Sequence, residues 1–184
     1  MVTRRAPRVL AALAVATLLG AHARGAEPER PTEWAVKAAY LYNFTLFVEW
    51  PDRPESAPDA PFVVGILGPD PFGRVLDDTL AGKTVGGRPI VVRRLQRPED
   101  AAAVQILFIA SAADTEVAKA LRAARGKPVL TVADVDELGR RSVVLAFRIL
   151  DSRVRFEVNL ALAEDAGLKI SSQLLKLALA VERR

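Results

Sequence analysis

Cysteine is absent from the 184-residue chain, and histidine occurs once, at His22. A chain without thiols forms no disulfide and has no thiolate nucleophile, so its stability must come from packing alone. Aromatic residues are also few, with two Trp, two Tyr and seven Phe, but six of them lie between Trp34 and Trp50. That stretch needs a separate explanation.

The first 23 residues have the three parts of a secretory signal peptide. Residues 4–8 contain three arginines, residues 9–19 form an apolar run, and Ala21-His22-Ala23 has the A-x-A form of a cleavage site. The alternative is an uncleaved anchor, but about eleven apolar residues are too few to span a bilayer. We therefore expect cleavage near Ala23 and a periplasmic protein with no membrane span after cleavage.

Removal of this segment changes both the charge and the available chemistry. The net charge of +4 becomes nearly neutral, which gives no support to nucleic-acid binding. His22 is lost as well, and without His or Cys the usual catalytic triads and nearly all zinc or transition-metal sites are excluded. The sequence therefore predicts that the protein is not an enzyme and has no metal or cofactor.

Residues 24–31 read as an extended lead-in, and residues 32–184 as one α/β domain. Thr32 is a suitable N-cap for a helix that runs to Trp50 and is stopped by Pro51. Strands and helices then alternate, which is typical of a layered domain with a mixed, mostly parallel sheet flanked by helices. The expected strands are Phe62–Leu67, Ile90–Leu95, Ile106–Ile109 and Val129–Val132, and the expected helices are Phe72–Leu80 and Asp114–Arg125.

A β-hairpin followed by helices is predicted to end the domain. The turn Asp151-Ser152 joins strands at Val143–Leu150 and Arg153–Asn159, and helices are expected at Leu160–Ala166 and Ser171–Glu182. Simple pairing predicts a core face that consists of Leu145, Phe147, Ile149, Val154, Phe156 and Val158.

The opposite face of this hairpin has Arg148 directly across from Arg155. Two opposed guanidinium groups repel each other unless a negative group lies between them. Glu157, one diagonal step away, is one candidate for that group. The other reading is that the arginines bind an anionic ligand or an acidic patch on a partner.

The aromatic helix has more apolar residues than one core face requires. Tyr42, Leu46 and Trp50 recur at intervals of four and form a second ridge opposite the main one. A helix buried on both sides would explain this ridge. An interface with another subunit or a partner protein would also explain it, because Tyr and Trp are favoured there.

Three residues are candidates for a ligand site at the carboxyl ends of the strands. Asp70 lies in the turn Gly68–Gly73, and Ser111 and Asp134 follow the next two buried strands. The turn lacks the pattern of a phosphate loop, since it has prolines where free N–H groups are needed. A rigid structural turn is the alternative.

Several long motifs resemble the YfiR-like family of periplasmic proteins. They are VKAAYLYNFTLFVEWP, GILGPDPFG, LAGKTVGGRPIVVRRL, ILFIA, VLTVAD and VRFEVNLALAEDAGLKISSQLLKLA. The resemblance implies a dimeric α/β protein that represses an inner-membrane diguanylate cyclase through its periplasmic domain and so controls cyclic di-GMP and biofilm. Family members often carry cysteines, some of which are tied to redox sensing. This chain has no thiol for such a switch.

Two functional hypotheses therefore stand. The first is a periplasmic regulator that acts by protein–protein contact through Tyr42, Leu46 and Trp50. The second is a small-molecule binding module that uses Asp70, Ser111, Asp134 and the pair Arg148 and Arg155.

Overall fold

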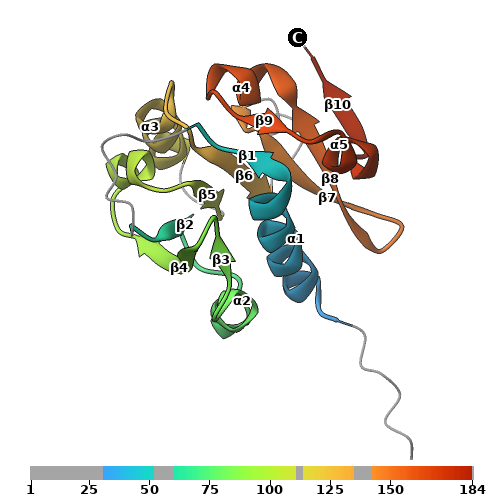
Figure 1. Cartoon of the computed structure of the whole chain (residues 1–184), viewed down its shortest axis with the longest axis horizontal. Coiled ribbons are helices and arrows are strands. Elements are labelled where there is room, and N and C mark those ends of the chain that lie inside the picture. Colours follow the sequence, from blue (N-terminus) through green and yellow to red (C-terminus); the bar gives the residue numbers. More distant parts are fainter. Residues whose placement is uncertain (1–30, 52–59, 111–113, 135–141, 184) are drawn as a thin grey trace, which may run out of the picture. The chain divides into compact units, whose positions relative to one another are not determined.

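A computed structural model describes residues 31–51, 60–110, 114–134 and 142–183 of the chain. Within this part, one eight-stranded sheet forms the centre of the molecule, with the strand order β10-β8-β7-β6-β5-β2-β4-β3 (Figure 1). Its strands are β2 (Phe62–Leu67), β3 (Thr84–Val85), β4 (Arg88–Leu95), β5 (Ile106–Ile109), β6 (Leu130–Asp134), β7 (Leu145–Leu150), β8 (Arg153–Asn159) and β10 (Ala180–Glu182).

The central strands β4, β2, β5, β6 and β7 run parallel to one another. β8 is antiparallel to β7, β10 is parallel to β8, and β3 is antiparallel to β4. The predicted mixed, mostly parallel sheet is confirmed. The carboxyl ends of five neighbouring strands therefore lie at one edge of the sheet and their amino ends at the other.

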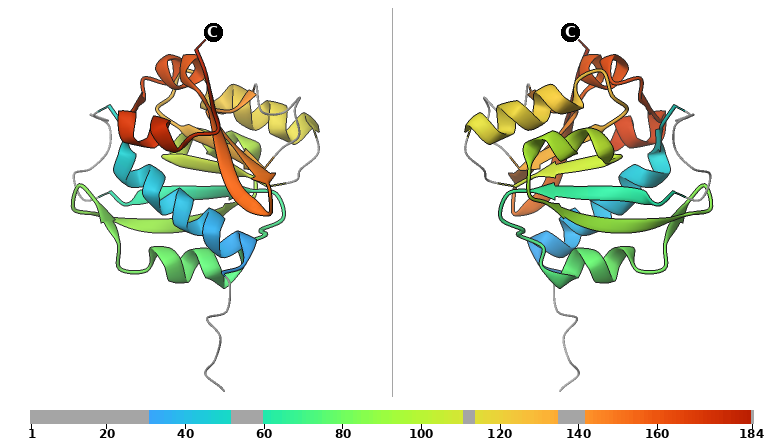
Figure 2. Two further views of the ribbon diagram at one scale, coloured as in Figure 1. Left: turned by 90° about the vertical axis from the view of Figure 1, so that its right-hand side faces the viewer. Right: turned by 90° about the vertical axis from the view of Figure 1, so that its left-hand side faces the viewer.

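Helices cover both faces of this sheet (Figure 2). One face carries the main core, to which α1 (Glu33–Phe47), α2 (Arg74–Leu80), α4 (Leu160–Asp165) and α5 (Ser172–Leu177) contribute buried side chains. The 3-10 helix η1 (Pro98–Ala103) and α3 (Asp114–Ala124) lie on the other face, over a second core. This arrangement follows from the buried strands β2 and β5, which are apolar toward both faces.

The helix α1 lies diagonally across the main core. Thr32 caps its first turn, since the Thr32 side chain accepts a hydrogen bond from the Ala35 N–H at 3.2 Å. Phe44 is fully buried and packs edge-on against Phe156, with 5.4 Å between the ring centroids. Burial of one such side chain contributes about 1.5–3 kcal/mol to stability. The aromatic stretch therefore first builds the core.

The predicted helix is too long at its end. α1 stops at Phe47, and Val48 and Glu49 form strand β1, which pairs with β9 (Lys169–Ile170) in a separate two-stranded sheet. The backbone turns extended at Val48 because this residue fits into the core, 5% exposed, opposite Ile170. β-branched Val48 favours the strand, and tertiary pairing overrides the helical pattern of the preceding residues.

The predicted hairpin is confirmed, including its register. Phe147 pairs with Phe156 and Arg148 with Arg155, and the turn residues Asp151 and Ser152 have φ angles of 49° and 57°. Two left-handed residues in a row are the geometry of a tight hairpin turn. Ile149 lies on the predicted face, opposite Val154, but 52% of it is exposed near the tip of the hairpin, so the core does not extend to this residue.

The last predicted helix is also too long. α5 ends at Leu177, and Ala180–Glu182 form β10 at the edge of the sheet. The Leu179 N–H donates to the Phe156 carbonyl at 2.7 Å, which starts the pairing with β8. The residues from 178 onward are good helix formers, but the open edge of β8 offers backbone partners that a helix would leave unused.

Candidate functional site

The structure separates the three residues of the predicted α1 ridge. Trp50 lies beyond the end of the helix and turns toward the domain, where its indole N–H donates to the Gln105 carbonyl at 3.3 Å. Its ring packs edge-on against Phe62, with 5.0 Å between centroids. Trp50 therefore does not continue the helical ridge, and its contacts are with the core of its own domain.

Tyr42 and Leu46 remain on α1, and they differ in exposure. Tyr42 is partly buried, and the Lys83 ammonium lies 4.4 Å from the centroid of its ring. Leu46 is 52% exposed. Of the three predicted interface residues, Leu46 is the one whose side chain is most available to another molecule.

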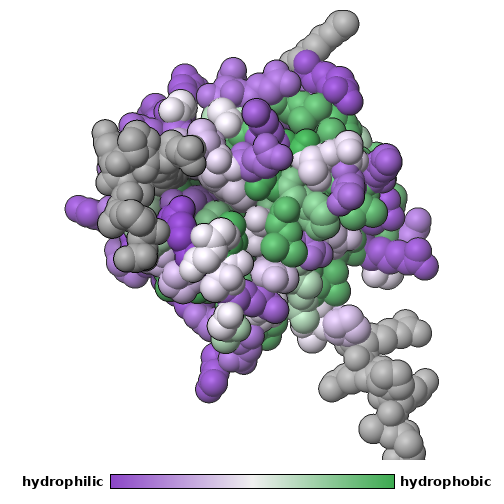
Figure 3. All heavy atoms as spheres, viewed as in Figure 1, coloured by the Kyte–Doolittle hydropathy of each residue, from purple (hydrophilic) through white to green (hydrophobic). Residues whose placement is uncertain are grey.

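Two further leucines are exposed on the segment that packs beside α1. Leu177, at the end of α5, is 57% exposed, and Leu179, just before β10, is 39% exposed. The Ser171 N–H at the start of α5 donates to the Phe47 carbonyl at the end of α1, at 2.9 Å. Figure 3 shows apolar side chains on the face of the molecule that presents α1 and α5. We call Leu46, Leu177 and Leu179 the α1–α5 surface.

A buried lysine connects α1 to the carboxyl edge of the sheet. Lys37 is fully buried, and its ammonium pairs with Glu33 on the same helix and with Asp134 at the end of β6. The ammonium also lies 4.2 Å from the centroid of the Trp34 ring, within the range of a cation–π interaction. Asp134, a predicted ligand residue, is thus already paired.

Lys37 was not among the predicted site residues, although its spacing carries the signal. Lys37, Leu41 and Phe44 recur at intervals of four and three, so the lysine lies on the buried stripe of the helix. A lysine on such a stripe is paired when it is fully buried. The identity of its partner across 97 positions of sequence required the structure.

The turn that contains Asp70 is fixed by a second ionic cluster. One carboxylate oxygen of Asp70 accepts the N–H groups of Phe72 and Gly73 at 2.8 and 3.3 Å. The other accepts from the Arg94 guanidinium, 2.9 Å from Nε. Arg94 also donates to Asp77, which lowers the pKa of the Asp77 carboxyl through hydrogen bonding and charge. Asp70 therefore holds the shape of its own turn.

Aromatic packing occupies the space below this turn. Phe72 is 3% exposed and packs edge-on against Trp34 at 5.3 Å and against Phe108 at 4.8 Å, measured between ring centroids. These contacts lie on the α1 side of the sheet, next to the carboxyl ends of β2 and β5. The other predicted residue here, Ser111, lies outside the described residues.

The two predicted arginines of the hairpin lie on the opposite face of the sheet from Lys37. Arg148 follows Phe147, the partner of Asp134, and successive strand residues point to opposite faces. The Arg148 Nε lies 3.9 Å from a carboxylate oxygen of Glu157. Glu157 therefore balances part of the charge of the opposed arginines. The structure does not bring Asp70, Asp134 and the arginine pair into one site.

Comparisons with known proteins identify the family. The model of the YfiR/HmsC-like family matches residues 34–179, which is most of the chain. The chain belongs to the YfiR/HmsC-like family. A search of curated proteins finds no match.

One solved structure matches part of this chain. It is a conserved domain protein from Vibrio cholerae O1 biovar eltor str. N16961, with 11% sequence identity and a TM-score of 0.49. The match covers 82% of this chain and 60% of that one, so the YfiR/HmsC-like chain spans less than two thirds of its neighbour. Among the described residues, no helix is long and apolar enough to cross a membrane.

Proposed function

We propose that this YfiR/HmsC-like protein is a periplasmic regulator that acts by protein–protein contact and restrains an inner-membrane diguanylate cyclase. Family membership supports a regulatory role in cyclic di-GMP signalling. The composition is compatible with it, because the chain has no cysteine and only His22 within the expected signal peptide. The target we propose is the periplasmic domain of the cyclase.

The observation that carries the proposal is the α1–α5 surface. Leu46, Leu177 and Leu179 are each more than a third exposed, on α1, at the end of α5 and just before β10. Exposed leucines on α1 and on the neighbouring segment 177–179 offer apolar surface of the kind that another protein covers. Because the neighbouring buried residues Leu41 and Leu174 fix these helices, the surface is preorganised and loses little entropy on binding.

We propose that the same surface also serves self-association. A two-fold dimer uses one patch twice, so a single apolar surface is sufficient for a symmetric contact. Dimer and partner would then compete for Leu46. A regulator of this kind would release its target when the balance between the two contacts changes.

Affinity capture from the cell envelope tests this function. The tagged protein is cross-linked in place, and its partners are identified by mass spectrometry. We expect an inner-membrane diguanylate cyclase among them, and we expect Leu46→Asp to weaken its capture by about 30-fold, the equivalent of about 2 kcal/mol for a central interface residue. Circular dichroism should show an unchanged fold, because the leucine is exposed.

Leu150→Asp is the matched control. Leu150 is 47% exposed, close to the value for Leu46, but it lies at the tip of the β7–β8 hairpin. Normal capture by this variant together with loss in Leu46→Asp would assign the contact to the α1–α5 surface. Equal capture by both variants would contradict that assignment, and the recovery of no membrane protein at all would contradict the regulator function itself.

A further inference from the structure

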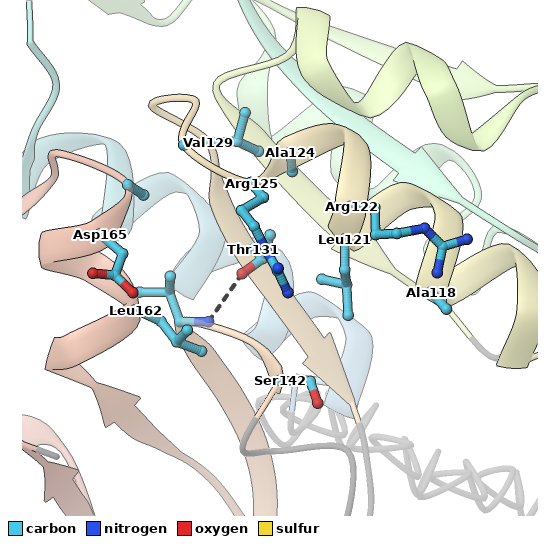
Figure 4. Close-up of a pocket in the computed structure, with 13 residues that line it drawn as sticks. Ala118, Leu121, Arg122, Ala124, Arg125, Val129, Thr131, Ser142, Leu162 and Asp165 are labelled. Atoms are coloured by element: carbon cyan, nitrogen blue, oxygen red, sulfur yellow. Dashed lines mark hydrogen bonds between the residues drawn. The ribbon is translucent and has the colours of Figure 1, made fainter.

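A groove lies at the amino edge of the sheet, between the end of α3 and α4 (Figure 4). Its volume is about 590 Å³, within the range of about 300–1,000 Å³ that is usual for small-molecule sites. The predicted ligand residues Asp70 and Asp134 belong to the opposite edge. We call this hollow the amino-edge groove.

The walls of the amino-edge groove are largely apolar. Leu121 on α3 and Leu162 on α4 line it from opposite sides, with Val129 and Val144 ahead of the strands β6 and β7. Leu121 and Leu162 are only partly buried, so they offer uncovered hydrocarbon to a molecule inside. Such a lining favours a ligand with an apolar body.

One cation points into this apolar space. Figure 4 shows the Arg125 side chain directed into the groove beside Thr131, whereas the Arg122 side chain, which also borders the groove, points away from Thr131. Within the described part of the chain, Arg125 has no ion-pair partner. A guanidinium with unused donors binds carboxylate oxygens in a two-pronged geometry.

Thr131 and Asp165 narrow the class of ligand. Thr131 is 7% exposed, and its hydroxyl oxygen accepts the Val144 N–H at 2.9 Å, so the hydroxyl hydrogen is available to a ligand oxygen. Asp165 lines the α4 side of the groove and repels a second negative charge. The carboxyl end of α3 carries partial negative charge, which disfavours an anion nearby. This effect is weak here, because the Arg122 and Ala124 carbonyls already accept backbone N–H groups.

We propose that the amino-edge groove binds a small amphipathic molecule with a single carboxylate. The carboxylate pairs with Arg125 and accepts a hydrogen bond from Thr131, and the apolar part lies between Leu121 and Leu162. This site is separate from the α1–α5 surface, and the inference does not depend on the regulator function. A ligand that binds only the folded protein must also raise its melting temperature.

Calorimetric titration of the purified protein with decanoate tests the proposal. We expect one site per chain, and we expect Arg125→Gln to weaken binding by about tenfold or more, because it removes the charged fork. Arg122→Gln is the control: it removes the same charge from the same helix, but from a side chain that points away. This variant should bind decanoate within about twofold of the unchanged protein.

Two related probes test the charge requirement. Decanamide keeps the apolar chain without the charge and should bind at least about tenfold more weakly than decanoate. Decanedioate carries a second carboxylate, which Asp165 should disfavour. Absence of decanoate binding to the folded protein, equal losses in Arg125→Gln and Arg122→Gln, or equal affinity for all three probes would overturn the proposal.

A substitution of a residue that lines the groove distinguishes loss of the binding site from loss of the fold. Leu162→Asp places a second carboxylate in the groove and should abolish decanoate binding. If this variant is unfolded by circular dichroism, the milder Leu121→Ser replaces it, with binding expected to fall by about threefold or more. Unchanged decanoate affinity in the folded wall variant would overturn the location that we assign.

Discussion

The two edges of the central sheet use charge in opposite ways. At the carboxyl edge, where open α/β sheets commonly bind ligands, the polar side chains pair with one another: Asp70 with Arg94, and Asp134 with Lys37. At the amino edge, Arg125 points into a groove of about 590 Å³ without an ion-pair partner among the described residues. The fold alone therefore does not locate a ligand site. The decisive property is which charged groups the protein leaves unpaired.

The amino edge of the sheet has a closed part and an open part. Near β2 and β5, Trp50 closes it by packing on Phe62 and donating to the Gln105 carbonyl. The Gln105 side chain in turn accepts the Val63 N–H at 2.7 Å. Near β6 and β7, the described residues that line the groove include no aromatic side chain. Trp50 therefore covers the part of this edge next to β2 and β5.

Trp50→Ala should have the largest effect, because it opens the closed part. We expect a loss of about 3 kcal/mol in the free energy of unfolding, since the indole leaves a cavity over Phe62 and the Gln105 carbonyl loses its donor. Urea unfolding measures the change. Leu46→Ala is the control and should change stability by less than about 0.5 kcal/mol at its exposed position. Similar values for both variants would mean that Trp50 does not close this edge.

Substitution of Lys37 tests the carboxyl edge. Lys37→Ala removes both the ammonium and its buried hydrocarbon chain, and should cost about 2 kcal/mol. Lys37→Met keeps most of the volume and should cost about 1 kcal/mol or less, because Glu33 and Asp134 are 45% and 32% exposed and can be hydrated when unpaired. The same urea experiment measures both. Equal losses of stability in Lys37→Ala and Lys37→Met would show that the charge of Lys37, rather than its volume, stabilises the fold.

Asp77→Asn should have the smallest effect and a defined pH dependence. Hydrogen bonding from Arg94 lowers the pKa of Asp77 in the folded protein, so the ion pair stabilises the fold above the ordinary carboxyl range. This contribution is lost as the pH falls through the lowered pKa. Because the Asp77 side chain is 45% exposed, we expect at most about 1 kcal/mol at pH 7.

Thermal unfolding across pH measures this difference, with Asp78→Asn as the neighbouring control. Asp78 is exposed and has no ion-pair partner among the described residues, so its substitution should leave the profile unchanged. A stability gap between Asp77→Asn and the unchanged protein that persists at pH 2 would contradict the assignment to the ion pair.

Local sequence signals predicted the parts of the fold that depend on neighbouring residues. The strands Phe62–Leu67, Ile106–Ile109 and Arg153–Asn159 have the predicted bounds, because apolar runs and turn residues mark both ends. The register of the hairpin followed from the two-residue turn. The ends of α1 and α5 were wrong, because β9 and β8 supply pairing partners that lie far away in the sequence.

The site was less predictable for the same reason. The sequence placed Leu46 and Trp50 on one helical ridge and left open whether that ridge is buried, since nothing local indicates a hydrogen bond from Trp50 to Gln105 across 55 positions. It also gave no means to distinguish Arg122 from Arg125, which lie three residues apart and point in different directions. Side-chain direction at the end of a helix depends on tertiary packing, which periodicity does not encode.

The contact between α1 and the β7–β8 hairpin also affects the order of folding. Lys37 meets Asp134 across 97 positions of sequence, and Tyr40 and Phe44 pack on Phe156, which comes later still. The first helix therefore completes this part of the core only when the hairpin is available, and distant contacts of this kind slow folding. The main core is therefore completed late, when the first helix and the last third of the domain come together.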